Sequence, residues 1–518
     1  MRNSTSWFMQ LSSFFSTSRR YPNLFIWGVL SICIGCNAPK TPEEAVVEPP
    51  NIVLIIADDM NWNDCGAYGH PNIQTPNIDA LATAGMRFDR GYVTASSCSP
   101  SRASIITGKY PHNTGAEQLH WPIPEGTTTF VQQLKANGYY TAAAGKWHMG
   151  PHIRQHFDTV REANVAGFQL PTGASKETKT MVAPEPSGCE HWVSMLENRP
   201  KNQPFFMWFA ALDPHRAYEE GILEKPHSIS DVQVPPYLPD VPEVREDLRM
   251  YYDEIGRLDA YVGEVVAELK AQGVEEQTLI LFISDNGRPF PRDKTTLYEG
   301  GIKTPWIVKW PAQVAEGSVS QSLVSTVDIS STFLELAGLT PLDKSDGVSF
   351  LPVLTDPGSE PRKYVFGEDH WHDFEDHGRA IISEEWKLIR NTYGELAGTP
   401  PADALRSPTF KAMLQLKAAE KLTEAQFACF RLPRGEYELY KLSDDPNELH
   451  NLIHEPAYAL IREELKKALN DWGQITGDFI PTQRTPDEFD RVSGEPIPSV
   501  RKRPRPDKKV MFGTYGAY

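Results

Sequence analysis

Four long apolar runs constrain the fold of this chain more than any other feature. They span residues 51–57, 139–145, 205–212 and 278–284, and each ends in polar residues. Continuous apolar runs of this length are typical of strands that are buried on both faces. Residues 252–271 instead repeat apolar side chains at helical spacing, and Gly273 marks a stop. Strands that alternate with helices predict an α/β fold whose sheet is covered by helices on both faces.

Polar side chains follow all of these predicted strands. In chain order they are Asp58 and Asp59, Lys146 and His148, Asp213 and His215, and Asp285 and Asn286. Ligands of open α/β sheets bind beyond the carboxyl ends of the strands. We therefore expect carboxylates, a lysine and histidines from separate segments to converge at one edge of the sheet.

The acidic pairs indicate a divalent cation. Asp58 and Asp59 are adjacent carboxylates, which repel each other unless a cation lies between them. Asp285 and Asn286 add a carboxylate oxygen and an amide oxygen. A set of oxygen donors suits calcium better than zinc. The alternative interpretation is that each pair only caps a following turn or helix.

Residues 97–104, with the sequence Ser-Cys-Ser-Pro-Ser-Arg-Ala-Ser, form the most informative short segment. We expect a helix to begin near Ser101, which places Cys98 beside a helix N-terminus, where anions are attracted. Arg102 adds a fixed positive charge. The alternative interpretation is a cysteine that is merely buried or reactive.

The pattern Cys98-x-Pro100-x-Arg102, followed by Ala-Ser and Thr-Gly, resembles the recognition sequence of the type I sulfatase family. Residues 145–148, 213–215 and 284–287 resemble other segments of that family, and the similarity extends over nearly the whole chain after residue 50. The resemblance implies an α/β fold similar to alkaline phosphatase, in which helices flank a large mixed sheet and a smaller C-terminal α+β domain follows. It also implies a hydrolase that acts on sulfuric ester or sulfur–nitrogen bonds.

The resemblance implies residue roles as well. Cys98 would be oxidised to formylglycine by a formylglycine-generating enzyme, and its hydrate would attack sulfur. One calcium ion would be held by Asp58, Asp59, Asp285, Asn286 and the modified residue 98. Arg102 and Lys146 would hold the hydrate, Lys294 would bind the sulfate, His215 would give a proton to the leaving group, and His148 would assist release of sulfate.

Further segments resemble the heparan N-sulfatase (sulfamidase) branch of the family. They are residues 213–216, 234–240, 289–291, 295–298 and 407–410. The resemblance implies that the substrate is the N-sulfate of glucosamine in heparin or heparan-type chains. Lys294 departs from the branch, which carries arginine there, and lysine lacks the bidentate fork of arginine. We expect the residues that contact substrate to be Asp213, Arg216, His120 and His370, and His372 to line the same pocket. Glu368 and Asp369 either bind a sugar or amine or belong to a solvated loop.

Three alternatives to an N-sulfatase stay open at this point. The chain could be an O-sulfatase, for example on 6-O-sulfated glucosamine, or a phosphonate or phosphate ester hydrolase with the same residues. It could also be a surface lipoprotein that only binds sulfated glycan. A net charge of −17 argues against nucleic acid as a partner.

The N-terminus is typical of an export signal. Arg19 and Arg20 precede a short apolar run over residues 24–35, which ends at Cys36. This end resembles a bacterial lipoprotein cleavage site with Cys36 as the lipidated residue; the alternative is a Cys-x-x-Cys redox motif. We expect a signal peptide over residues 1–36 and a tether over 37–50. The protein would then lie in the periplasm or at the outer membrane, lipid-anchored.

The remaining chain divides into three predicted regions. A catalytic domain spans residues 51–375, and a C-terminal subdomain spans 376–482, with short strands at 386–390 and 437–440 and a helix at 457–472. Residues 483–518 form a Pro-rich basic tail, which is either solvated or an arm that binds polyanions. A disulfide among Cys65, Cys189 and Cys429 stays open.

Overall fold

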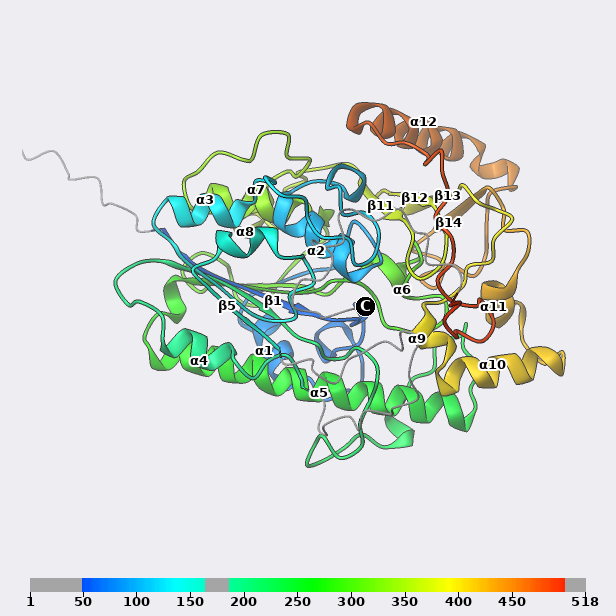
Figure 1. Cartoon of the computed structure of the whole chain (residues 1–518), viewed down its shortest axis with the longest axis horizontal. Helices are drawn as coiled ribbons and strands as arrows, with labels where there is room; N and C mark the ends of the chain where they lie inside the picture. Colours follow the sequence, from blue (N-terminus) through cyan, green and yellow to red (C-terminus); the bar gives the residue numbers. More distant parts are fainter. Residues whose placement is uncertain (1–48, 164–185, 499–518) are drawn as a thin grey trace, which may run out of the picture. The chain divides into compact units, whose positions relative to one another are not determined.

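The structure is a computed structural model that describes residues 49–163 and 186–498. Within these ranges the central sheet contains eight strands (Figure 1). Its order is β5-β4-β6-β1-β7-β8-β2-β9. Strands β5, β4, β6, β1 and β7 are parallel, β8 is antiparallel to β7 and β2, and β9 is parallel to β2. The bounds are β1 Asn51–Ala57, β2 Met86–Phe88, β4 Tyr140–Gly145, β5 Thr159–Glu162, β6 Phe205–Ala210, β7 Thr278–Ser284, β8 Trp306–Lys309 and β9 Ser318–Ser320. The predicted large mixed sheet is therefore confirmed.

Strand β1 lies between β6 and β7 at the centre of this sheet, with Val53 opposite Met207 on one side and Ile280 on the other. Residues 52–57 are fully buried. Successive side chains of a strand point to opposite faces, so one set of β1 residues packs into each of two hydrophobic cores. The unbroken apolar run in the sequence reflects this burial on both faces.

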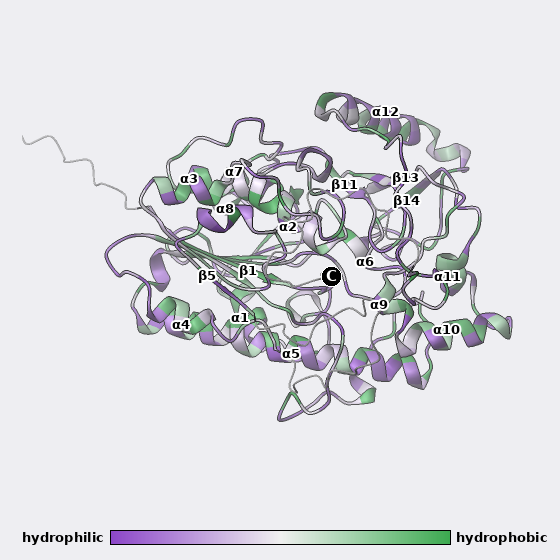
Figure 2. Ribbon diagram, in the orientation of Figure 1, coloured by the Kyte–Doolittle hydropathy of each residue, from purple (hydrophilic) through white to green (hydrophobic). Residues whose placement is uncertain are grey.

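Helices cover both faces of the sheet (Figure 1). One core contains apolar side chains of α2, α3, α7 and α8, and the other contains those of α1, α4, α5 and α10. Figure 2 shows the hydrophobic colour along the central strands, whereas these helices alternate between polar and apolar residues. The helices are α1 Pro76–Thr83, α2 Cys98–Thr107, α3 Phe130–Ala136, α4 Trp192–Glu197, α5 Pro242–Ala271, α6 Glu299–Ile302, α7 Asp328–Leu336, α8 Leu351–Thr355, α9 Ala402–Leu405, α10 Pro408–Ala418, α11 Glu424–Phe427 and α12 Ala459–Thr476.

Two helices begin earlier than the sequence predicts. Helix α2 begins at Cys98 and not near Ser101, because Pro100 lies in its first turn, where the missing N–H of proline costs nothing. Helix α5 begins at Pro242, ten residues ahead of the predicted start at residue 252. The first turns of α5 contain few buried apolar side chains and many charged residues, so the helical spacing of apolar residues cannot be recognised there in the sequence. The predicted stop is correct, since Gly273 follows α5 with a φ of 67°.

A smaller antiparallel sheet of order β11-β12-β13-β14 follows the large one. Its strands are β11 Val365–Asp369, β12 Gly378–Ile382, β13 Trp386–Asn391 and β14 Tyr437–Lys441, and α12 packs Leu465, Leu469 and Trp472 onto it. Strand β11 precedes residue 376, where the sequence places the start of this region, yet it belongs to this sheet. A further pair of short strands, β3 Gly91–Tyr92 and β10 Val324–Ser325, is parallel.

Several predictions from the sequence concern residues outside the described ranges. They are the signal peptide with Cys36, nearly all of the tether, and residues 499–518 of the basic tail. Within the described ranges, no helix is long and apolar enough to cross a membrane. Cys65, Cys98, Cys189 and Cys429 are all buried free thiols, so the described cysteines form no disulfide with one another.

Candidate active site

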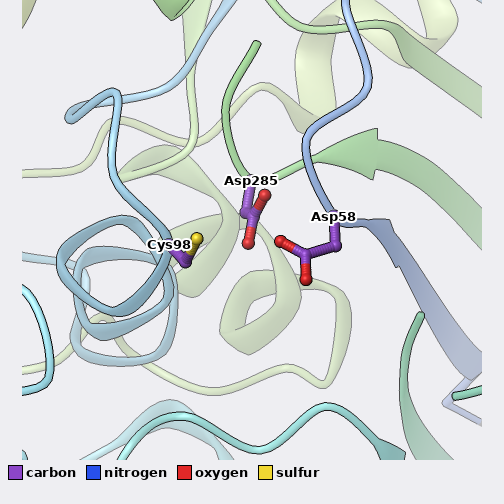
Figure 3. A group of neighbouring side chains, drawn as sticks. All are labelled: Asp58, Cys98 and Asp285. Carbon is purple, nitrogen blue, oxygen red and sulfur yellow. The ribbon is translucent and has the colours of Figure 1, made fainter. Parts of the chain in front are cut away.

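Carboxylates at the ends of β1 and β7 meet the first residue of α2. Asp58 follows β1 directly, Asp285 follows β7, and Cys98 opens α2. Figure 3 shows these side chains pointing toward one another. Their ligand atoms all lie within 4.8 Å of one another, and all three residues are buried. The parallel sheet produces this cluster, because it brings the carboxyl ends of β1 and β7 side by side.

Each buried carboxylate of the cluster is paired with a cation from another segment. Lys146, which follows β4, forms an ion pair with Asp58. Lys294 Nζ lies 2.7 Å from Asp59, and Arg102 Nη2 on α2 lies 2.7 Å from Asp285 Oδ2. Burial alone lowers the pKa of Lys146 and Lys294, but the carboxylates beside them raise both pKa values above the usual range. Both lysines are therefore charged at neutral pH.

The oxygen atoms of this cluster suit a hard divalent cation. Oδ1 of Asp58 and Oδ1 of Asn286 are buried, and neither accepts a hydrogen bond from any described residue. Buried polar atoms without a partner are rare, so these oxygens are available to a ligand. Asp59 adopts a φ of 71°, which turns its carboxylate toward Asn286, whose Nδ2 donates to it over 2.7 Å. Three carboxylates and one amide oxygen form the donor set of calcium or magnesium.

Cys98 occupies the first position of α2, where the free N–H groups of a helix attract negative charge. Its side chain is only 2% exposed, and Sγ lies 3.9 Å from Asp59 Oδ1. Burial raises the pKa of the thiol, although Lys146 and Lys294 oppose this shift. The unmodified thiol is therefore protonated at neutral pH, and a protonated thiol is a weak nucleophile.

Two predicted histidines lie beside the cluster with their ring orientations set by neighbours. His148 Nε2 lies 2.6 Å from Nδ1 of His120, whose backbone N–H donates to Ser99 Oγ on α2. Burial, and then the charge of His120, lowers the pKa of His148 well below its usual value. His215 Nδ1 lies 2.5 Å from the carbonyl oxygen of Arg216, and Nε2 lies 3.7 Å from Asp59 Oδ2.

Three predicted substrate contacts have partners within the chain. Both carboxylate oxygens of Asp213 accept from Arg257 on α5, over 2.7 and 2.8 Å. The guanidinium of Arg216 donates two hydrogen bonds to Asp247 of the same helix, over 2.6 and 2.8 Å, and lies over the rings of Tyr218 and Phe290. His370 lies 2.6 Å from the buried Glu368. These contacts stabilise the fold, and the substrate role of the three side chains stays a prediction.

Two residues of the C-terminal half lie near the cluster instead. His372 Nδ1 lies 2.7 Å from Oγ of Ser97, the residue before Cys98. Asp403 in α9 has Oδ2 3.9 Å from His215 Nε2. His372 is among the residues that the sequence predicts for the pocket, whereas Asp403 is not, because an aspartate two residues after Pro401 is typical of a helix start and of nothing more.

Comparisons with known proteins agree with this geometry. A family model described as "Sulfatase" matches residues 50–339, more than half of the chain. A second model, described as "N-sulphoglucosamine sulphohydrolase, C-terminal", matches residues 290–398. An ulvan-active sulfatase of Formosa agariphila is 30% identical over 508 residues, which cover 86% of this chain and 80% of the relative. Human N-sulphoglucosamine sulphohydrolase is 31% identical over 473 residues, which cover 83% of this chain and 91% of the relative.

Solved structures show the same fold. One of them, a protein in complex with its substrate D-glucosamine-2-N,6-O-disulfate, superposes with a TM-score of 0.64 over 84% of this chain and 99% of its own. The two sequences are 22% identical, and the likeness is one of fold.

Proposed function

The chain belongs to the sulfatase family, whose members hydrolyse sulfate esters or sulfamates with a formylglycine and a metal ion, and on this premise we propose that it removes the N-sulfate of glucosamine in heparin or heparan-type chains. Cys98 would be the residue converted to formylglycine, and the metal would be a single calcium ion. The observation that supports this proposal most is the convergence of Asp58, Asp285 and their paired cations on the N-terminus of α2.

Four side chains would hold the metal: Asp58, Asp59, Asp285 and Asn286. When bound, the calcium ion supplies positive charge to sulfate oxygens, and the converted residue 98 supplies the attacking oxygen. The cations of this chain would assist sulfate binding, because Arg102, Lys146 and Lys294 lie beside the carboxylates of the cluster, where sulfate would bind. Charge held in place in a dry site stabilises negative charge that develops in the transition state.

His215 is oriented to give a proton to the leaving group. A backbone carbonyl only accepts hydrogen bonds, so His215 Nδ1, which lies 2.5 Å from the Arg216 oxygen, carries a hydrogen. Nε2 is then the nitrogen that takes up and gives the catalytic proton, and it faces Asp59 and Asp403. His148 would take a proton during sulfate release, and its Nε2 contacts Nδ1 of His120.

Two observations support an N-sulfated substrate. The C-terminal family model carries the name of an N-sulphoglucosamine sulphohydrolase, and the human enzyme of that name is similar over most of its length. The segments at residues 213–216 and 407–410 resemble the same branch. Lys294 departs from the branch, which has arginine there; it keeps the positive charge and pairs with Asp59.

Product analysis tests the proposal. Protein with formylglycine verified at position 98 would be incubated with N-sulfoglucosamine and, separately, with glucosamine 6-sulfate. We expect sulfate and free amine to appear together from the first substrate and neither to appear with Cys98→Ala protein. Sulfate from the second substrate alone would keep the enzyme class and reject the N-sulfate.

An O-sulfatase is the second candidate, because a relative of similar identity is an ulvan-active sulfatase. It predicts release of sulfate from an O-sulfated polysaccharide without any free amine. Parallel incubation with ulvan therefore separates the two candidates.

We also propose that the chain is exported and anchored by a lipid on Cys36, and that a formylglycine-generating enzyme matures Cys98. The apolar run that ends at Cys36 and the pattern around Cys98 support this. Mass spectrometry of protein from its own host should find a lipidated N-terminal cysteine and an aldehyde at residue 98. Recovery of the intact N-terminus in a soluble fraction would reject the anchor.

A further inference from the structure

Asp403 is a carboxylate that the sulfatase mechanism does not use, yet it faces the reacting groups. It lies in α9, and its Oδ2 is 3.9 Å from His215 Nε2. Ligand atoms of Asp59, His215 and Asp403 all lie within 4.8 Å of one another. Asp403 therefore lies beside the nitrogen that gives a proton to the leaving group.

The segment around Asp403 is anchored, which gives this carboxylate a defined direction. Oδ1 of Asp403 accepts from the backbone N–H of Ala404 over 2.7 Å. The N–H of Ala402 donates to Asp373 Oδ2 over 2.9 Å, and Ala402 and Leu405 are buried. One carboxylate oxygen is thus held by the backbone, while Oδ2 is directed at His215.

Asp403 is ionised and reachable. Burial alone would raise its pKa, but the nearby charges, with that of Lys294 the largest and that of His215 next, lower the pKa to about 2. Its side chain is 22% exposed, so a ligand can contact it. A separation of 3.9 Å is too long for a direct hydrogen bond between Asp403 Oδ2 and His215 Nε2.

We propose that Asp403 binds the leaving nitrogen of an N-sulfated amine and thereby selects N-sulfates over O-sulfates. This inference rests on the proposed function. In a sulfamate, the nitrogen that leaves carries a hydrogen and can donate it to Asp403 Oδ2. The bridging oxygen of a sulfate ester has no hydrogen to donate, and it gains negative charge as it leaves, which the carboxylate repels.

The step balances in atoms and electrons. A hydroxyl of the hydrated residue 98 would bond to sulfur and lose its proton to a neighbouring carboxylate such as Asp59, whose Oδ1 lies 3.9 Å from Sγ of Cys98, and the sulfur–nitrogen bond would break with its electron pair on nitrogen. His215 Nε2 gives that nitrogen one proton, which produces a free amine. The amine then has two N–H groups, and one of them donates to Asp403.

Kinetics of Asp403→Asn test the inference. Asparagine keeps the oxygen that accepts from Ala404 and removes the charge. We expect kcat/KM on N-sulfoglucosamine to fall at least tenfold, as for loss of a charged hydrogen bond. The rate on an O-sulfate ester, 4-nitrophenyl sulfate, should stay within about twofold of wild type or rise. The exposed Asp343→Asn serves as the matched control and should change neither rate.

Binding gives a readout that needs no turnover. Calorimetry would measure the Kd of glucosamine and of 2-deoxyglucose for Cys98→Ala protein with and without Asp403→Asn. Glucosamine should bind at least tenfold more weakly when Asp403 is replaced, whereas the Kd of 2-deoxyglucose, which has no hydrogen-bond donor at carbon 2, should change little. An unchanged Kd for glucosamine in a variant with a wild-type thermal midpoint overturns the inference.

The outcomes separate this inference from the proposed function. If wild-type protein cleaves only O-sulfates, both fail. If wild-type protein cleaves N-sulfoglucosamine and Asp403→Asn leaves the ratio of N- to O-sulfate rates unchanged, only the role of Asp403 fails.

Discussion

Individual side chains in the site carry charges that would be costly to bury alone. Asp58, Asp59 and Asp285 are fully buried, and each is paired with a lysine or an arginine. The unpaired oxygens on Asp58 and Asn286 leave this arrangement incomplete among the described residues. Burying charged or polar groups without partners costs several kcal/mol. A bound cation would complete the set, and metal binding would then contribute to stability.

Calcium should therefore stabilise the folded protein. At a concentration of one hundred times its Kd, the expected gain is about 2.7 kcal/mol, measured as a rise in thermal midpoint over protein held in EGTA. Asp285→Asn should lose most of this response, while the exposed Asp343→Asn should keep it. A wild-type midpoint that calcium leaves unmoved would contradict the metal site.

Arg216 has a structural role in the fold. Its guanidinium donates two hydrogen bonds to Asp247 and lies over two aromatic rings, a geometry that lysine cannot reproduce. Arg216→Lys should lower the free energy of unfolding by about 2 kcal/mol, as measured by urea denaturation, while kcat of the folded fraction stays near wild type. Arg431→Lys, in an exposed ion pair, is the control and should cost almost nothing. A large fall in kcat at unchanged stability would support the predicted substrate contact.

At the scale of elements, the site depends on how sharply the chain turns after each strand. Gly145 ends β4 with a φ of 97°, a conformation that glycine adopts without strain. The next residue, Lys146, donates its backbone N–H to the carbonyl oxygen of Ala210 over 2.8 Å. This contact fixes the point from which Lys146 reaches Asp58.

Gly145→Ala should break this turn. An added Cβ would lie 1.8 Å from the Ala210 oxygen, so the strand end has to shift. We expect a loss of about 3 kcal/mol from the clash and the positive φ together, and a fall in activity as Lys146 moves. Gly138→Ala is a matched control, because Gly138 has a φ of 92° but open space around its Cβ position. Chemical denaturation of both variants checks this; equal losses would show that the close contact is unimportant.

At the scale of the whole molecule, a buried network joins the smaller sheet to the segment that follows α2. Glu368 of β11 contacts His112, which follows α2, with its Oε1 2.7 Å from His112 Nδ1. His370 and Arg379 of the smaller sheet surround the same carboxylate. Burial would raise the pKa of Glu368, but Arg379 and the two histidines lower it well below its usual value. Despite its own burial, His112 has a raised pKa because of Glu368.

This network predicts the pH dependence of stability. The lowered pKa of Glu368 stabilises the fold at pH values above the pKa of an unfolded Glu, about 4.3. This contribution is lost as the pH falls below that value toward the folded pKa. The raised pKa of His112 stabilises the fold below about 6.5, and that contribution is lost as the pH rises through the folded value. Glu368→Gln should therefore cost about 3–5 kcal/mol near pH 5.5, and the difference from wild type should shrink in acid.

Urea denaturation between pH 3 and pH 8 measures this difference. Glu384→Gln, whose carboxylate is exposed, is the control and should follow the wild-type curve. A constant gap between Glu368→Gln and wild type at every pH would mean that the ionised pair is not the cause.

The sequence by itself determined the core strands, the cluster at their carboxyl ends and the importance of Cys98. These features depend on local information, since burial on both faces leaves an unbroken apolar run and a parallel sheet gathers its strand ends. Only the tertiary structure decided which polar side chains enter the site. Arg257 and Asp247, both on α5, engage Asp213 and Arg216, and α9 delivers Asp403 from a segment with no distinctive pattern. The direction of a side chain depends on partners far along the chain, and no local motif contains them.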